Sequence, residues 1–267
     1  MMDLLGALPG AVAQGLVWGV MAIGVYITYK ILDIADLTVD GTICTGAAVC
    51  TMMMLSGQSP WLSILGAMLA GALAGVVTGL LHVFLGIPAI LAGILTQMTL
   101  WSVNLKILGK ANQAISARNT TVLLSQMNIP HALIVLAVVG VLTVAILYLF
   151  FGTELGCSIR ATGCNQSMSR AQGINTNFTK VTGLAISNAI VALSGALLCQ
   201  YQGYTDINMG RGAVVIGLAA VVIGEALVRR ISPNFAVRLT GVIAGAIVYY
   251  VVYQTIIFVG FDTDMLK

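Results

Sequence analysis

The amino-acid sequence predicts an all-α, polytopic membrane protein in which residues 1–267 form a single transmembrane domain. Its mean hydropathy is +1.01 and 8% of its residues are charged, against roughly 25% in soluble proteins. This number of polar residues is too small to cover the surface of a globule in water. Lipid must therefore be the solvent. Apolar runs of about twenty residues follow one another, long enough to cross a hydrocarbon core of about 30 Å as helices. These unbroken runs differ from the alternating strands of outer-membrane barrels.

Eight membrane segments are expected, at approximately 10–32, 42–56, 61–85, 89–109, 131–151, 178–200, 213–228 and 238–259. Turn-forming residues separate the second, third and fourth segments at Gly57–Pro60 and Gly86–Pro88. Polar stretches at 110–130 and 152–177 flank the fifth. The seventh segment is short for a span and is expected to be a tilted or half-membrane helix.

The distribution of lysine and arginine predicts the orientation. If the polar loop 152–177 is cytoplasmic, both termini face outward. Seven basic residues then lie inside and five outside: Lys30, Arg160, Arg170, Lys180, Arg229, Arg230 and Arg238 against Lys106, Lys110, Arg118, Arg211 and Lys267.

Glycines repeat at four-residue spacing in two of the segments, which gives helix faces that allow close approach. These glycines are Gly71, Gly75 and Gly79 in the third segment, and Gly241 and Gly245 in the eighth. Packing within one bundle is the commoner use of such faces, and a dedicated dimer face is the other.

Composition and motifs argue against several classes of function. A net charge of +3 without a basic cluster does not indicate nucleic-acid binding. The five cysteines show no CxxC spacing, and the chain has neither an HExxH motif nor a phosphate-binding loop, so neither a metal site nor a stand-alone enzyme is expected. Energy from ATP would have to come from another subunit.

The stretch ILDIADLTVDGT, Ile31–Thr42, holds Asp33, Asp36 and Asp40, three of the nine acidic residues. A carboxylate within a membrane domain costs about 2.5–3.5 kcal/mol unless it meets water, protein or a partner charge. Three interpretations are open: a solvated loop, a helix cap with Asp40 as N-cap of the second segment, and a broken helix that lines a cavity. In the fourth segment, Gln97, Trp101 and Asn104 share one helix face and either line a path or bond between helices.

The loop between the fifth and sixth segments contains signals for a short helix. Asn165 suits a helix N-cap, Gly173 suits the left-handed residue that ends a helix, and Ile174 can fold back onto it. Gln166–Gln172 would then form about two turns, roughly 10 Å long. Such a helix is a rigid lever that could dock on a partner, although a solvated loop fits the spacing equally well.

The same loop, TELGCSIRATGCNQSMSRAQGI, resembles the cytoplasmic coupling segment of ABC-importer permeases of the branched-chain amino acid and ribose type. Their pattern, T-x-x-G-x-x-I-R-A-x-G-x-N-x-x-x-A/S-R-x-x-G-I, aligns on Thr153, Gly156, Ile159, Arg160, Ala161, Gly163, Asn165, Ser169, Arg170, Gly173 and Ile174. DLTVDGT, Asp36–Thr42, is similar to the tryptophan/tyrosine transport permeases. AVVIGEAL differs from the family's A-V-V-I-G-G run by Glu225 in place of the second glycine.

The resemblance implies a permease of the bacterial plasma (inner) membrane that contacts the lipid bilayer, two ABC ATPase subunits, an extracellular substrate-binding protein and a second permease copy, with a homodimer as the simplest arrangement. ATP and magnesium would bind to the ATPase, and this chain would bind no cofactor. The substrate would be a small polar solute, with an aromatic amino acid as the first choice. Coupling is assigned to Glu154, Gly156, Arg160, Ala161, Gly163, Asn165, Ser169, Arg170, Gly173 and Ile174.

The family's counterpart of the acidic stretch lies near the translocation path, which favours a cap combined with a cavity lining. The path is therefore assigned to Asp36, Thr38, Asp40, Gly41, Gln97, Trp101 and Asn104. Two other functions are kept open. One is an ion-coupled secondary transporter that uses Asp33, Asp36 and Asp40 as ion ligands or proton carriers. The other is a structural membrane subunit without a path.

Overall fold

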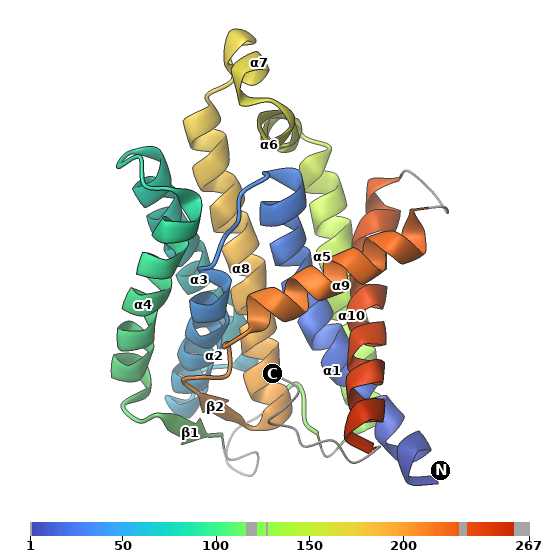
Figure 1. The fold of residues 1–267 in the computed structure, drawn as a ribbon. Helices are drawn as coiled ribbons and strands as arrows, with labels where there is room; N and C mark the ends of the chain where they lie inside the picture. Colours follow the sequence, from blue (N-terminus) through green and yellow to red (C-terminus); the bar gives the residue numbers. More distant parts are fainter. Residues whose placement is uncertain (1, 116–121, 127, 230–233, 259–267) are drawn as a thin grey trace.

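The computed structural model describes residues 2–115, 122–126, 128–229 and 234–258 and confirms the all-α, multi-pass class. Each of the eight expected segments corresponds to an apolar helix of one bundle (Figure 1). These are α1 (Met2–Tyr26), α2 (Val39–Leu55), α3 (Pro60–Val83), α4 (Ala89–Leu108), α5 (Ile129–Phe151), α8 (Thr176–Gln202), α9 (Ala213–Val228) and α10 (Phe235–Phe258). In the described ranges, six spans are long enough to cross a membrane, while α2 and α9 have 17 and 16 residues.

The first span does not run directly into the second. The α1 helix continues into one turn of π-helix, η1 (Ile27–Ile31), after which residues 32–38 run as non-helical chain until α2 begins. Figure 1 shows that this segment descends from the end of η1 to a point within the bundle, where α2 starts. The expected break near 33–41 is therefore present. The α9 helix also starts inside the bundle and runs obliquely across it, as its short length predicts.

The repeated glycines lie at contacts within the bundle. A Cβ atom on Gly71, Gly75 or Gly79 would meet α8, which is buried over most of its length. Gly241 and Gly245 of α10 face α9 in the same way. Both faces are thus used inside one chain, as the commoner of the two interpretations expects.

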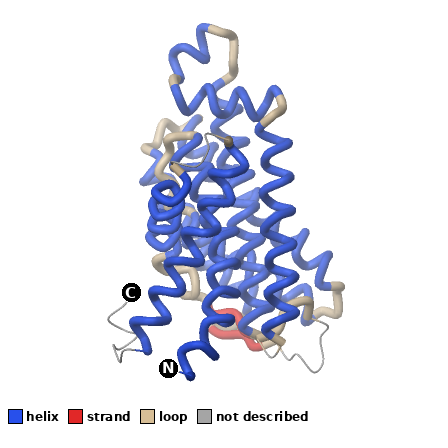
Figure 2. The backbone as a smooth tube through the Cα atoms, turned by 90° about the vertical axis from the view of Figure 1, so that its right-hand side faces the viewer, coloured by secondary structure: helices blue, strands red, loops and turns tan. Residues whose placement is uncertain are grey.

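The two ends of the bundle differ. Two short helices, α6 (Glu154–Cys164) and α7 (Gln166–Ala171), stand at one end, and a two-stranded antiparallel ladder of β1 (Asn112–Ala114) and β2 (Tyr204–Asp206) lies at the other (Figures 1 and 2). The sequence did not predict this ladder. The α1 helix begins and α10 ends at the ladder end. Three of the basic residues used for the orientation, Arg118, Arg230 and Lys267, lie outside the described residues.

Candidate functional site

Asp36 is buried inside the break between η1 and α2. Its side chain is 6% exposed; Oδ1 accepts the backbone N–H of Thr38 at 2.9 Å, and Oδ2 accepts the side-chain amide of Asn188 at 2.8 Å. Asp33, in contrast, is exposed and has a left-handed backbone with φ of 54°. The solvated-loop interpretation therefore describes Asp33 and is wrong for Asp36.

A network of hydroxyl groups continues from Asp36 into four helices. Thr42 of α2 donates to the Asn188 carbonyl oxygen of α8 at 2.7 Å. The hydroxyl of Thr38 lies 2.8 Å from that of Thr78 in α3, which in turn donates to Thr96 in α4 at 3.0 Å. All of these side chains are buried. The network fixes the break relative to α2, α3, α4 and α8, and it satisfies polar groups that would otherwise be costly to bury.

Asp40 acts as a cap, but for a different helix from the one that the sequence predicted. The N-cap of α2 is Thr38, and Asp40 lies in the first turn of that helix. Its carboxylate accepts the backbone N–H groups of Gly212 at 3.1 Å and Val214 at 2.9 Å. These groups belong to the start of α9, whose own N-cap, Gly212, has no side chain to satisfy them. Asp40 therefore joins the N-termini of α2 and α9, where a negative charge is favourable.

A cavity of about 190 Å³ lies between α2, α4 and the segment that leads into α9. Five of the seven residues assigned to the path line it, namely Asp40, Gly41, Gln97, Trp101 and Asn104. The other two, Asp36 and Thr38, are buried and do not line it. The structure thus brings the shared face of α4 against the start of α2, close to the α9 N-terminus.

Asn104 has an unusual environment in this cavity. Its side-chain amide nitrogen donates to the carbonyl oxygen of Gly41 at 3.3 Å, which sets the orientation of the amide group. Its Oδ1 is buried and has no hydrogen-bond donor among the described residues. A buried acceptor without a partner is rare in folded proteins and points to a donor from outside the chain.

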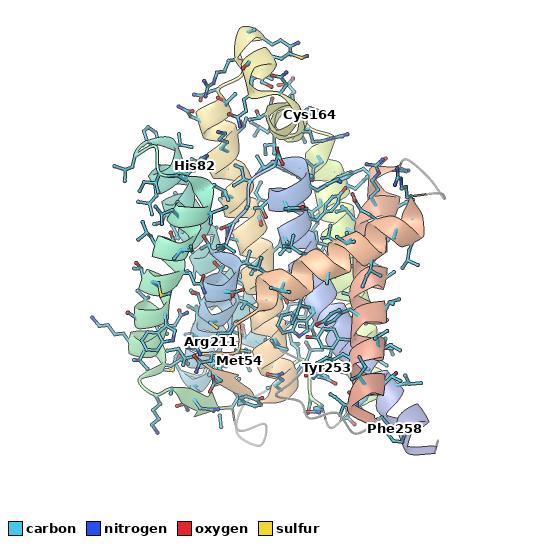
Figure 3. All side chains as sticks on the ribbon, viewed as in Figure 1. Met54, His82, Cys164, Arg211, Tyr253 and Phe258 are labelled. Carbon is cyan, nitrogen blue, oxygen red and sulfur yellow. The ribbon has the colours of Figure 1, made fainter. Side chains whose placement is uncertain are left out.

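A second cavity of about 650 Å³ lies between α1, α9, α10 and the β1–β2 ladder. Its aromatic lining includes Trp18, Tyr249, Tyr250 and Tyr253, with the Trp18 and Tyr250 rings 5.9 Å apart between centroids. Sequence reasoning missed the tyrosines, although positions 249, 250 and 253 share a helix face. Arg211 borders both cavities. Figure 3 shows Arg211 and Tyr253 in the half of the bundle away from Cys164, the last residue of α6.

The short helix expected after Asn165 is present as α7. Asn165 Oδ1 accepts the backbone N–H of Met168 at 3.0 Å, and Gly173 has φ of 83°. The backbone N–H of Ile174 donates to the carbonyl oxygen of Ser169 at 3.0 Å, and the backbone N–H of Gly173 donates to the carbonyl oxygen of Arg170 at 3.0 Å. This pair of bonds is the Schellman motif, so both predicted ends of the helix are found.

The α6 helix before it was not predicted, although Thr153 provides the usual N-cap by accepting from Gly156 N–H at 3.3 Å. A Cβ atom on Gly156 would meet the backbone of Phe151, and one on Gly163 would meet the carbonyl oxygen of Ile31. The α6 helix therefore lies directly against the end of η1, one residue before the break begins. Glycine at position 163 permits this close approach.

The residues assigned to coupling differ in exposure. Glu154, Arg160, Asn165, Arg170 and Gly173 are exposed, Gly156 and Ser169 are buried, and Ala161, Gly163 and Ile174 are intermediate. The two arginines also have contacts within the chain. The Arg160 guanidinium lies 5.5 Å from the centre of the Phe235 ring, and Arg170 Nε donates to the hydroxyl of Thr176 at 2.8 Å.

Glu225, which departs from the family pattern, does not disturb the packing of α9. The neighbouring Gly224 makes the close contact with Gly241 of α10. The Glu225 carboxylate instead lies 3.1 Å from the Lys30 ammonium group of η1. This ion pair ties the far end of α9 to the turn on which α6 rests.

Comparison with known proteins identifies the family of this chain. A family model described as "Branched-chain amino acid transport system / permease component" matches residues 8–266. The chain is 39% identical over 236 residues to a "Tyrosine transport system permease protein" of Clostridioides difficile (strain R20291), covering 88% of this chain and 78% of that protein. It is 32% identical over 259 residues to "Uncharacterized protein RP368" of Rickettsia prowazekii (strain Madrid E), covering 96% and 91%.

An "Autoinducer 2 import system permease protein LsrC" of Escherichia coli (strain K12 / DH10B) is 28% identical over 199 residues, covering 71% of this chain and 55% of that protein. The family match extends over nearly the whole bundle, from the first turns of α1 past the end of α10. This chain therefore belongs to the family of permease components of branched-chain amino acid transport systems.

Proposed function

We propose that this permease is the membrane subunit of an ABC importer that takes up an aromatic amino acid. The observation that carries the proposal is the capped α6–α7 segment at one end of the bundle, where α6 packs on the bundle and α7 projects beyond it (Figure 1). The choice of substrate is supported by the aromatic lining of the larger cavity and by the similarity to a tyrosine transport permease.

In this proposal the α6–α7 end is cytoplasmic and docks an ATPase subunit. Its caps make it rigid, its outer side chains are exposed to a partner, and Gly163 places α6 on the end of η1. A push on α6 would therefore reach the break at 32–38 directly. ATP and magnesium belong to the ATPase, and two ATPase copies would act on a homodimer of this permease.

The opposite end would face outward and receive substrate from an extracellular binding protein. Both cavities border Arg211, which precedes α9, and the larger one is also bordered by β2 residues Tyr204 and Asp206. Substrate delivered at this end would meet the larger cavity beside the ladder. The path would then run between the two permease copies.

Uptake in whole cells tests the proposal. The permease is expressed with an ATPase and a binding protein encoded beside it, and accumulation of radiolabelled tyrosine, tryptophan and leucine is measured with and without depletion of ATP. We expect tyrosine or tryptophan uptake to exceed leucine uptake and to be abolished when the catalytic ATPase residue is inactivated. Uptake that survives in ATP-free vesicles under a proton or sodium gradient would contradict it.

Ion coupling through the three aspartates receives no support from the described contacts. Asp36 and Asp40 accept hydrogen bonds from the protein's own N–H groups, and Asp33 is exposed outside the buried network. Asp36 and Asp40 thus hold the fold together and Asp33 lies at the surface, so the three carboxylates do not form one ion site.

A further inference from the structure

The smaller cavity combines an acceptor, a cation and an aromatic surface within one small space. Asn104 provides the acceptor, Arg211 the cation and Trp101 the aromatic ring. The cavity volume of about 190 Å³ is below the range of roughly 300–1,000 Å³ that is usual for drug-sized ligands. A group of amino-acid size fits this space better than a larger solute.

The Asn104 acceptor calls for a ligand that donates a hydrogen bond. The residue is 1% exposed and its Oδ1 has no donor within the described part of the chain. The amide cannot simply be reversed, because its nitrogen already donates to Gly41. The carboxylate of Asp40 lines the same cavity and adds negative charge. An ammonium group, with three donors and a positive charge, satisfies both features.

Arg211 calls for the opposite charge. Its side chain is exposed, and the described residues provide its guanidinium with neither an ion pair nor a hydrogen bond in the structure. A guanidinium group presents paired donors that match a carboxylate. Arg211 also borders the aromatic cavity, where Asp206 is the neighbouring acid. Because Arg211 borders both cavities, the carboxylate of a substrate would stay within reach of its guanidinium group while the substrate passes from the larger cavity to the smaller one.

We propose that the smaller cavity recognises the zwitterionic α-amino acid group of the transported substrate, with Arg211 holding its carboxylate and Asn104 Oδ1 accepting from its ammonium group. Trp101 and Met98 give an apolar surface for the side chain of that substrate. This inference rests on the proposed importer function and identifies the part of the permease that selects for an amino acid.

Equilibrium binding to the purified full-length permease in nanodiscs tests the assignment. The probes are L-tyrosine, tyramine, which lacks the carboxylate, and 3-(4-hydroxyphenyl)propionate, which lacks the amine. We expect the wild-type protein to bind tyrosine at least tenfold more tightly than either analogue. Arg211→Gln should weaken tyrosine binding about tenfold and leave tyramine binding within twofold, since tyramine has no group for Arg211.

Asn104→Leu should give the complementary pattern, weakening tyrosine and tyramine but leaving 3-(4-hydroxyphenyl)propionate within twofold. Lys106→Gln removes an exposed charge from the same helix and serves as the matched control, with unchanged binding of all three probes. If Asn104→Leu fails to fold, binding of the three probes to Arg211→Gln tests the site by itself, because the exposed side chain of Arg211 has no packing role. Equal binding of the three probes by the wild-type protein, or no measurable tyrosine binding, would overturn the inference.

Cellular uptake separates this inference from the function on which it rests. If tyrosine and tryptophan are not imported in an ATP-dependent manner by the wild-type system, the proposed function fails. If import is normal in the wild type and equally fast in Arg211→Gln and Asn104→Leu at subsaturating substrate, the importer function stands and the zwitterion site is wrong.

Discussion

The α6–α7 segment and the junction of α2 with α9 are both held by side-chain caps, but the caps span very different lengths of chain. In α7, Asn165 bonds to a residue three positions away. At the junction, Asp36 bonds to Asn188 across 152 positions and Asp40 to Val214 across 174. The cap of α7 forms within the short segment itself, whereas the caps at the junction form only when the bundle is assembled.

This difference assigns different mechanical roles to the two regions. A segment with local caps keeps its shape while it moves as a body, which suits a lever. A junction with distant caps holds separate helices in register, so a change there alters the relation between α2, α8 and α9. The contact between Gly163 and Ile31 places the lever next to the chain that leads into the junction.

Removing the Asp36 carboxylate should have the largest effect. Asp36→Ala leaves two buried N–H groups without an acceptor, that of Thr38 and one of the two in the Asn188 amide, whose other N–H keeps the Leu184 carbonyl. Each unpaired donor costs about 1–3 kcal/mol. We expect a loss of about 2–6 kcal/mol in the free energy of unfolding. Thermal denaturation of the purified protein in detergent measures this loss.

Asp33→Asn is the control for that substitution, because asparagine tolerates the left-handed backbone at this exposed position. Its effect should stay within about 0.5 kcal/mol. Hydrogen exchange in Asp36→Ala should accelerate in α2 and α8 together. Acceleration confined to residues 32–38 would mean that the junction is held as locally as α7.

A methyl group at Gly163 should give the next largest effect. It would push α6 away from the carbonyl of Ile31, and such overpacking costs about 1–3 kcal/mol, more than the gain in helix propensity of at most about 1 kcal/mol. ATPase-coupled uptake by Gly163→Ala should fall with the thermal stability. Gly140→Ala is the matched control, because its nearest neighbour would be a side-chain carbon of Ile243 at 3.6 Å, and it should be neutral or slightly stabilising. Equal behaviour of the two variants would show that the contact between α6 and η1 contributes nothing to coupling or stability.

The same contrast explains what the sequence could predict. Asn165, Gly173 and Ile174 mark a helix start and stop through partners within five residues, so their spacing indicated where a helix would begin and end. The choice between this helix and a solvated loop came from the family resemblance. The sequence favoured Asp40 as a helix cap among three interpretations. The choice between α2 and α9 depends on tertiary structure, because Asp40 and Val214 are 174 positions apart. The periodicity of Gln97, Trp101 and Asn104 placed them on one face, whereas nothing in the spacing shows that Arg211 faces them.

Removing the α7 cap should have a smaller and strictly local effect. Asn165→Ala leaves the Met168 N–H without its acceptor, at about 1 kcal/mol for a typical N-cap. We expect faster hydrogen exchange at residues 166–174 and an unchanged melting temperature for the bundle. Asn177→Ala, at an exposed position of α8 where Asn175 supplies the cap, should change neither quantity. A lower melting temperature in Asn165→Ala would show that α7 is coupled to the bundle more strongly than its local hydrogen bonds indicate.

The Lys30–Glu225 pair should contribute least, although it joins the two regions by tying η1 to α9. Its side chains are 47% and 32% exposed, and exposed ion pairs contribute about 0–1 kcal/mol. A double-mutant cycle of Lys30→Gln and Glu225→Gln should therefore give a coupling free energy below about 1 kcal/mol that decreases as salt is added. A larger, salt-insensitive coupling would mean that α9 is clamped at both ends, by Glu225 as firmly as by Asp40. The lever and the junction would then move as one body, since α6 rests on the same turn that carries Lys30.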